Sequence, residues 1–418
     1  MLHNSWTETR QLTVFHLVQP VDGGVARVVA DLVRAQTAEG IRTVVACPPG
    51  GRLAADAAAA GAQVHPWPAV RAPGPQLARE VLTAARLIRR TAPHLVHAHS
   101  AKAGLAGRLA VRGRLPTVFQ PHAWSFDAVE GRAAELALRW ERYGTRWATR
   151  TLCVSESERR AGERAGLAAR WCVIRNGIDL DHFRPGGGDG GADLGPDAAV
   201  KAARAELPQL APFPPDAPLA VCVGRLCRQK GQDILLRAWP QLLSAVPDAR
   251  LALVGDGPDR ERLMRMAPPG VLFAGASRDT RSWFRAADVV VLPSRWEGMA
   301  LAPLEAMACG RPVVVSDVSG ARESLPPGAV AHALVPPEDP RALASAIGRL
   351  LADPVLREEQ GRAARDHARA ACDVRQTAAA VSGLYRELLS HEPPRSQGPL
   401  SQEPPSPSRP RMRKRTTR

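Results

Sequence analysis

The sequence predicts an α/β protein with two doubly wound, Rossmann-like parallel-sheet domains, and three observations support this. The chain has 418 residues, more than one typical domain holds. Short apolar runs alternate with segments of helical periodicity, which is typical of a parallel sheet covered by helices on both faces. The alternation stops in a Gly/Pro-rich segment and then starts again. We therefore expect an N-terminal domain (1–185), a linker region (186–218) and a C-terminal domain (219–370), which face each other across a cleft.

The apolar runs and the amphipathic segments place the elements of the first half. Strands are expected over 11–18, 42–47, 63–67, 95–98, 117–120, 151–154 and 171–174. Helices are expected over 25–39, 54–60, 76–91, 102–112, 131–148 and 156–165. A turn at 176–179 ends this half, and the linker region holds one short helix-like piece near 198–207.

The second half repeats the pattern. Strands are expected over 219–223, 250–254, 271–274, 288–292, 312–316 and 333–335. Helices are expected over 231–245, 259–266, 280–287, the segment after Glu297, 341–351 and 356–389, with 371–391 as the closing helical segment. The end, 392–418, is rich in Pro, Ser and Arg, which predicts a disordered tail.

Charge and cysteine content limit the function classes. The net charge of +15 suits an anionic partner, whether nucleic acid, anionic lipid or a phosphorylated substrate. The seven cysteines show no C-x-x-C spacing, which indicates buried, reduced thiols. No signal peptide is evident, and no apolar run approaches the ~20 residues that span a bilayer. We expect a cytoplasmic protein, soluble or peripheral at the inner face of the cell membrane.

The unusual residues lie at the carboxyl ends of the expected strands. Ligands bind beyond these ends in an open parallel sheet. The candidates are Gly23 and Gly24, His122, Gly224–Arg225, Gly255–Gly257 and Glu297. Because every candidate falls on the same edge of its sheet, the set as a whole indicates a ligand site more strongly than any single motif.

The glycines and the cations suit an anionic group. Gly23 and Gly24 open a helix, where a phosphate can approach the backbone, although turn geometry alone could also require them. The loop lacks the G-x-G-x-x-G spacing of a dinucleotide site. Arg225 and Lys230 follow one strand and could hold a diphosphate leaving group. The alternative is two solvated cations, but Lys230 is one of only four lysines in an arginine-rich chain.

His122 and the helix 131–148 could each serve either the function or only the structure. His122 follows a buried strand, where a lone histidine is often structural, but its place at the cleft favours a ligand contact. No H-E-x-x-H motif or Cys/His cluster appears, so we expect no metal site. The helix 131–148 carries arginines among aromatic residues, which suits an anionic membrane surface or, equally, a packed helix with a solvated arginine face.

Over residues 11–389 the chain resembles the retaining glycosyltransferases of family 4, which have the GT-B fold. The resemblance rests on the Gly23–Gly24 loop, His97–Gly104, Pro121–His122, Val154–Ser155, Asn176–Asp179, Gly224–Arg225 with Lys230–Gly231, Gly255–Pro258, and the E-x7-E pair Glu297 and Glu305. Many relatives carry an aromatic residue or a second glycine after the first glutamate, where this chain has Gly298–Pro303. That difference concerns the identity of the sugar rather than the reaction.

The resemblance implies a nucleoside-diphosphate-sugar donor, a glycan, lipid-linked or small-molecule acceptor, retention of configuration and no metal. Arg225 and Lys230 would hold the pyrophosphate and Glu305 the ribose, while Glu297 and His122 would face the transferred sugar. Gly24 would approach the phosphates, and the backbone of Gly298, Met299, Ala300 and Leu301 would line the donor.

Two other classes of protein remain possible at this stage. A GT-B-fold sugar-nucleotide epimerase or hydrolase would share the donor site, but Arg225, Lys230 and the E-x7-E pair together favour transfer. A nucleic-acid-binding protein would suit the net charge, but no RNA-binding motif or stacking platform is visible.

Overall fold

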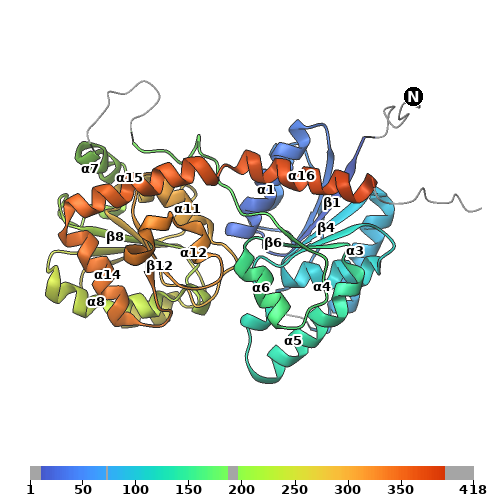
Figure 1. Ribbon diagram of the computed structural model, residues 1–418, viewed down its shortest axis with the longest axis horizontal. Coiled ribbons are helices and arrows are strands. Elements are labelled where there is room, and N and C mark those ends of the chain that lie inside the picture. Colours follow the sequence, from blue (N-terminus) through green and yellow to red (C-terminus); the bar gives the residue numbers. More distant parts are fainter. Residues whose placement is uncertain (1–10, 72–73, 187–195, 391–418) are drawn as a thin grey trace, which may run out of the picture.

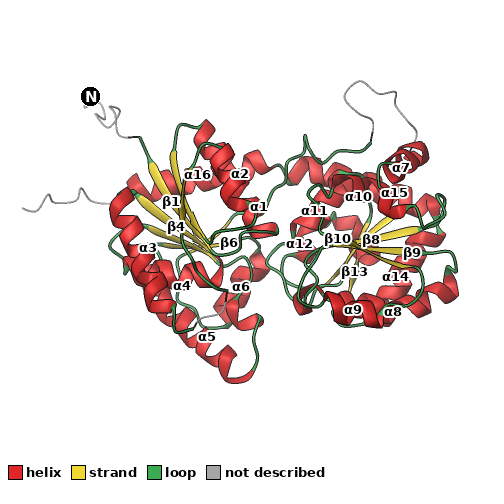
Figure 2. Ribbon diagram, turned by 180° about the vertical axis from the view of Figure 1, so that it is seen from behind, coloured by secondary structure: helices red, strands yellow, loops and turns green. Residues whose placement is uncertain are grey.

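The computed structural model describes residues 11–71, 74–186 and 196–390. Two parallel sheets lie side by side, each between layers of helices (Figures 1 and 2). The predicted disordered tail at 392–418 lies outside the described residues, as does most of the glycine-rich insertion of the linker region.

The first sheet has seven parallel strands in the order β3-β2-β1-β4-β5-β6-β7. The strands are β1 (Thr13–Val18), β2 (Arg42–Cys47), β3 (Gln63–Pro66), β4 (Leu95–His99), β5 (Thr117–Gln120), β6 (Arg150–Cys153) and β7 (Trp171–Val173). The helices between them are α1 (Gly24–Ala38), α2 (Leu53–Ala59), α3 (Leu77–Thr91), α4 (Ser100–Val111), α5 (Gly131–Gly144) and α6 (Glu156–Arg164).

The second sheet has six parallel strands in the order β10-β9-β8-β11-β12-β13. The strands are β8 (Leu219–Val223), β9 (Arg250–Val254), β10 (Val271–Gly275), β11 (Val289–Leu292), β12 (Val313–Ser316) and β13 (Leu334–Val335). The helices are α7 (Pro196–Ala205) before the sheet, then α8 (Gln232–Ala245), α9 (Arg260–Met266), α10 (Arg281–Ala286), α11 (Leu301–Ala308), α12 (Ala321–Ser324), α13 (Val330–Ala333), α14 (Pro340–Ala352), α15 (Pro354–Ala371) and α16 (Val374–Ser390).

The apolar runs form these strands because helices cover both faces of each sheet. All residues of β1, β4 and β11 are buried, so a strand here reads as a continuous apolar run rather than an alternating one. The prediction of two doubly wound parallel-sheet domains is confirmed, and the observed strands lie within two residues of the expected ranges.

The end of the chain differs from the expectation of one helix over 356–389. Helix α15 ends at Ala371 and α16 begins at Val374. Between them the backbone pairs with Ile178, whose N–H donates to the Cys372 carbonyl oxygen (2.8 Å) and whose carbonyl oxygen accepts from Val374 N–H (3.0 Å). The chain therefore crosses from the second domain to the first, and α16 packs beside α1 (Figure 1).

The cysteines and the helices can be compared with what the sequence led us to expect. None of the seven cysteines, all within the described residues, forms a disulfide. Among those same residues, every helix is too short or too polar to span a lipid bilayer.

Candidate functional site

The candidate residues gather at the points where the strand order of each sheet reverses. In the first sheet this point lies between β1 and β4, and in the second between β8 and β11. The loop after β1 carries Gly23 and Gly24, the loop after β8 carries Arg225 and Lys230, and the loop after β11 carries Glu297. A crevice at such a reversal is the usual ligand site of a doubly wound sheet.

Lys230 and Glu297 form an ion pair at the centre of the second-domain site. Lys230 Nζ lies 2.5 Å from Glu297 Oε1, which also accepts a hydrogen bond from Ser294 Oγ at 2.8 Å. The Glu297 side chain is 9% exposed and that of Lys230 21% exposed. The ammonium group has three donors, so it can keep this contact and still bind an anionic ligand.

A pocket opens beside this pair. Glu297 and Ala300 line it on one side, and Ser316 and Ser319 on another. The cavity has room for about one water molecule and its lining is mostly apolar, so a polyhydroxylated ligand would bind outside it. The two serines follow or end β12 and were not singled out from the sequence.

Arg225 makes no hydrogen bond or ion pair through its guanidinium group with any described residue. Its main chain is fixed, since Gln232 Nε2 donates to the Arg225 carbonyl oxygen at 3.0 Å. Across the cleft stands Arg71 of the first domain, whose pKa is lowered by partial burial and by the charge of Arg225. Two guanidinium groups that repel each other create a positive potential suited to an anion. Sequence reasoning missed Arg71, which lies in a loop without a motif.

Glu305 lies on α11 as a buried carboxyl group. Burial raises its pKa to about 7; Arg27 of α1 opposes this, while Asp31 and Asp279 add to it. The E-x7-E spacing puts Glu297 in the loop and Glu305 on the helix. Their environments differ accordingly, because only Glu297 has a cation in direct contact.

The first domain holds the loop between these glutamates. Ser155 Oγ donates to the Gly298 carbonyl oxygen at 3.1 Å, and Asn176 Nδ2 donates to the Met299 carbonyl oxygen at 2.8 Å. A Cβ atom on Gly298 would stand 2.9 Å from the carbonyl carbon of His122, so only glycine fits there. The second-domain loop therefore rests directly on the His122 turn.

The glycine loop of the first domain meets the same region. Leu301, which begins α11, lies 3.9 Å from where a Cβ of Gly24 would be. A Cβ on Gly23 would meet open space, and its φ of 80° favours glycine. The N-termini of α1 and α11 thus stand together, and α1 has no side-chain cap on its first N–H groups.

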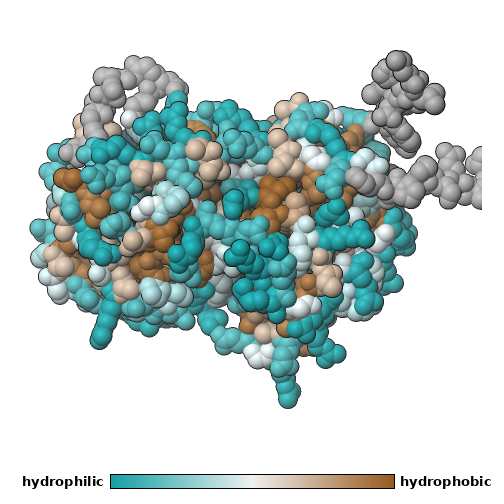
Figure 3. All heavy atoms as spheres, viewed as in Figure 1, coloured by the Kyte–Doolittle hydropathy of each residue, from teal (hydrophilic) through white to brown (hydrophobic). Residues whose placement is uncertain are grey.

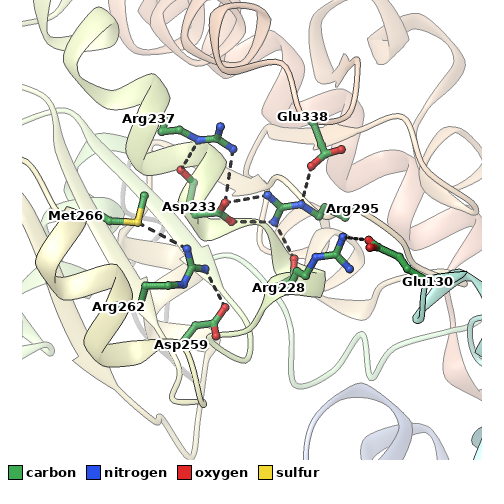
Figure 4. Close-up of polar contacts among 9 residues, drawn as sticks. All are labelled: Glu130, Arg228, Asp233, Arg237, Asp259, Arg262, Met266, Arg295 and Glu338. Carbon is green, nitrogen blue, oxygen red and sulfur yellow. Dashed lines mark hydrogen bonds and ion pairs between the residues drawn. The ribbon is translucent and has the colours of Figure 1, made fainter. Parts of the chain in front are cut away.

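A network of arginines braces the second-domain loops (Figure 4). Arg295 binds Asp233 of α8 through two hydrogen bonds of 2.8 Å, and also donates to Glu338 and to the Arg228 carbonyl oxygen. Arg228 in turn pairs with Glu130 of the first domain. These contacts fix the segment that carries Lys230 relative to the segment that carries Glu297.

His122 faces this site from a strained turn. Its φ is 58° and that of Ala123 is 138°, both unusual for residues with a side chain. Burial lowers the pKa of His122 to about 3, so the imidazole is neutral. Its Nε2 lies 3.2 Å from His99 Nδ1.

Glu158 supports the same turn and was not recognised from the sequence. Its carboxyl group is fully buried and accepts from the Val154 N–H at 2.7 Å. Burial raises its pKa to about 8, against the N–H groups of Val154 and Ala123, which lower it. A Cβ on Gly298 would stand 3.0 Å from its Oε1.

Three further histidines lie behind His122, in a cluster that the sequence spacing did not reveal. His16 of β1 pairs in register with His97 of β4, and His99 is two residues along the same face. Their ring nitrogens lie within 4.8 Å of one another, close enough to ligate a metal ion. The expectation of no Cys/His cluster was therefore wrong, because it considered only residues near in sequence. Hydrogen bonding already occupies several of these nitrogens.

Helix α5 is partly engaged by its own domain. Leu136 is 65% and Tyr143 46% exposed, so apolar surface is available on this helix. However, Arg142 donates to the Ala165 carbonyl oxygen, and the Arg146 guanidinium stacks 3.8 Å from the Tyr143 ring. On the face drawn in Figure 3, hydrophobic patches are interspersed with hydrophilic surface rather than gathered in one place.

Comparisons with known proteins identify the family and the fold. Residues 22–182 match the family model described as Glycosyltransferase Family 4, and residues 217–353 match that described as Glycosyl transferases group 1. Among solved structures, Anabaena HepE in complex with UDP and glucose superposes with a TM-score of 0.75 at 22% identity, covering 90% of this chain and 100% of that one. Sucrose-phosphate synthase from Thermosynechococcus elongatus superposes with a TM-score of 0.74 at 24% identity, covering 91% and 100%. At such identities these likenesses show the fold alone.

Curated relatives are closer in sequence. A GDP-mannose-dependent alpha-(1-6)-phosphatidylinositol monomannoside mannosyltransferase of Mycolicibacterium smegmatis is 36% identical over 203 residues, covering 45% of this chain and 49% of that protein. A D-inositol 3-phosphate glycosyltransferase of Streptomyces bingchenggensis is 34% identical over 326 residues, covering 71% and 67%. The chain thus spans about half of the first relative and two thirds of the second. With both halves matched and its fold shared, the chain belongs to glycosyltransferase family 4 and has the GT-B fold.

Proposed function

We propose that this protein moves a sugar, with retention of configuration, from a nucleoside-diphosphate-sugar to a glycan, lipid-linked or small-molecule acceptor. The observation that carries the proposal is the Lys230–Glu297 ion pair, which stands beside the unpaired Arg225 at one sheet reversal. Across the cleft, His122 and Gly24 contact the loop that follows Glu297. A diphosphate leaving group needs cations, and a polyhydroxylated sugar needs hydrogen-bond acceptors such as Glu297. Both must lie side by side for transfer.

Each candidate residue has a role in this proposal. Arg225 and Lys230 bind the diphosphate and stabilise the negative charge that grows as the glycosidic bond breaks. Glu305 accepts the ribose hydroxyls, Glu297 a hydroxyl of the transferred sugar, and His122 contacts that sugar from the first domain. The uncapped start of α1 at Gly23–Gly24 and the backbone from Gly298 to Leu301 approach the phosphates and the sugar.

The same arrangement favours a reaction without a metal ion at the diphosphate. Arg225 and Lys230 place positive charge where other transferases use a divalent cation. Glu297, the carboxylate beside these cations, already pairs with Lys230.

The acceptor is proposed to carry a phosphate. The matched relatives are named for phosphatidylinositol monomannoside, D-inositol 3-phosphate and, for an Escherichia coli galactosyltransferase, GlcNAc-diphosphoundecaprenol. Arg71, on the first-domain side and near enough to feel the charge of Arg225, is proposed to meet such a group. A lipid-linked acceptor would bring the protein, as a cytoplasmic enzyme, to the inner face of the membrane through the arginines of α5.

The donor is tested first by binding. A ligand that binds only the folded state raises the melting temperature, so UDP-, GDP- and ADP-sugars are compared by thermal shift. Transfer is then measured with the stabilising donor for Lys230→Ala and Glu297→Ala, with Lys201→Ala as the matched control. Lys201 pairs with Asp216 at the surface, with 63% of its side chain exposed.

We expect loss of transfer in the two site variants and normal transfer in the control. Near-normal turnover of Lys230→Ala and Glu297→Ala would refute the site assignment. The membrane contact has its own test: flotation with anionic liposomes should fail when Arg132 and Arg139 are changed, and should persist when the chain ends after Leu389. The reverse pattern would assign the contact to the tail.

A further inference from the structure

A chain of buried hydrogen-bonding groups runs from α1 to His122. His16 Nε2 lies 2.9 Å from Gln36 Oε1, His16 Nδ1 lies 3.1 Å from His99 Nε2, and His99 Nδ1 lies 3.2 Å from His122 Nε2. Gln36, His16 and His99 are each 0% exposed. The imidazole that faces the cleft is therefore connected, through two others, to an amide on the opposite side of β1 and β4.

All three imidazoles are neutral. Burial lowers the pKa of His16 to about 4 and that of His122 to about 3, and burial with the neighbouring histidines lowers that of His99 well below its usual range. A neutral imidazole has one N–H donor and one acceptor nitrogen. Each contact needs one donor and one acceptor. Once one imidazole donates toward Gln36, every other imidazole in the series must donate in that same direction. Only two arrangements of the protons therefore exist, one for each direction.

The orientation of the Gln36 amide selects between them. When its oxygen faces His16, the His16 Nε2 donates, His99 Nε2 donates to His16, and His122 Nε2 donates to His99. The His122 Nδ1 is then left with a lone pair. When the amide is reversed, every proton moves to the other nitrogen and His122 Nδ1 becomes a donor.

The structure places the Gln36 amide with its oxygen toward His16, 2.9 Å from Nε2. Beside it, the Tyr385 hydroxyl lies 2.5 Å from His97 Nδ1, and the tautomer of His97 decides which of the two groups donates. Gln36 raises the pKa of His16, against the larger effect of burial, as an acceptor does.

His122 Nδ1 is the open end of the chain. His122 is partly exposed, and none of the described buried atoms that lack a hydrogen-bond partner belongs to it. We propose that Gln36, acting through His16 and His99, holds His122 in the tautomer whose Nε2 carries the proton, so that Nδ1 offers a lone pair to the cleft. Resting on the proposed function, this makes His122 an acceptor for a hydroxyl of the transferred sugar, and makes Gln36, His16 and His99 positioning residues.

A metal ion bound by the histidine cluster would be incompatible with the series of hydrogen bonds from Gln36 to His122. His16 Nδ1 and His99 Nε2 cannot bind a metal and hydrogen-bond to each other through the same lone pairs. The two states are distinguished by a chelator, which would change a metal site and would leave the hydrogen-bonded chain as it is.

The test reads the tautomer directly. Solid-state ¹⁵N spectra of histidine-labelled protein separate a ring nitrogen that carries a proton from one with a lone pair, and His122→Asn identifies the His122 signals. We expect Nε2 protonated and Nδ1 unprotonated, with no change on addition of EDTA. A protonated Nδ1, or a shift of the cluster signals with EDTA, would overturn the proposal.

One variant removes the anchor of the hydrogen-bonded series and another serves as a control. Gln36→Met removes the amide that faces His16 and should give a mixture of His122 tautomers. Ser382→Ala changes a buried side chain of α16 and should leave the single tautomer intact. Retention of the single tautomer in Gln36→Met, once circular dichroism shows it folded, would refute the role of Gln36.

Activity gives an independent measure. With a donor established, Gln36→Met should lower kcat about tenfold, as expected for one weakened hydrogen bond, and change the donor KM little. An unchanged kcat despite mixed tautomers would refute the catalytic consequence. The spectra need no substrate, so absence of any transferase activity would count against the proposed function and leave the tautomer result standing.

Discussion

Replacing Glu158 by glutamine should stabilise the protein in a strongly pH-dependent way. The side chain is fully buried, and burial raises its pKa from 4.5 to about 8. A carboxyl group with a raised pKa in the folded state loses stability as the pH rises from 4.5 toward 8, because ionisation is easier in the unfolded chain. Glutamine keeps an acceptor for the Val154 N–H and never ionises.

The size of the effect follows from the same values. Between pH 6 and pH 9 the wild type loses about 3 kcal/mol, at about 1.4 kcal/mol per pH unit up to pH 7 and at a falling rate as the pH passes 8. The advantage of Glu158→Gln should therefore grow by about 3 kcal/mol from pH 6 to pH 9. For a domain of this size, the melting temperature of Glu158→Gln should exceed that of the wild type by about 6–12 °C more at pH 9 than at pH 6.

Thermal melts at pH 6 and pH 9 test this with a control on the same helix. Glu163 is 40% exposed and pairs with Arg159 at the surface, so Glu163→Gln should shift the melting temperature little and equally at both pH values. A Glu158→Gln shift that is equal at the two pH values, or that becomes less favourable at pH 9, would refute the idea of a buried, protonated carboxyl group.

Three further outcomes are expected. Gly298→Ala should abolish transfer with normal circular dichroism, since its Cβ would stand 2.9 Å from the His122 carbonyl carbon; full activity would contradict the close approach. Donor affinity, measured by calorimetry, should rise with pH through about 7 as Glu305 ionises and accepts the ribose hydroxyls, and a flat profile would remove Glu305 from the ribose. Glu141→Ala should destabilise the fold by about 3–5 kcal/mol in urea titrations, because Arg108, 0% exposed, would keep an unpaired charge. A loss below 1 kcal/mol would mean that the cavity takes up water.

The strands could be predicted, and candidate site residues could be chosen, because both steps depend on local pattern. Apolar runs of a few residues mark buried parallel strands, and the loops after them must meet at one edge of a sheet. Glu297, Arg225 and Gly24 were found in this way. Lys230 was singled out by the rarity of lysine, but that signal is not specific, since Lys102 forms a buried ion pair with Glu80 at 2.6 Å.

What could not be predicted depends on which distant segments become neighbours. The histidine cluster forms because β1 lies between β2 and β4, an order that no local pattern contains. The break between α15 and α16 lies within continuous helical periodicity. Asp373, followed by Gln376 at the third helical position, gave a usable N-cap signal, and the Asp373 carboxylate accepts from the Arg375 N–H.

The crossing of α16 makes the first domain discontinuous in sequence. Its sheet comes from residues 13–173, but Tyr385, fully buried against His97, comes from the last described helix. During synthesis the first domain therefore lacks one of its core side chains until the second domain has been made. The two domains are also joined by two passages of the chain rather than one. A relative rotation must bend both, which restricts opening of the cleft to a narrow set of axes.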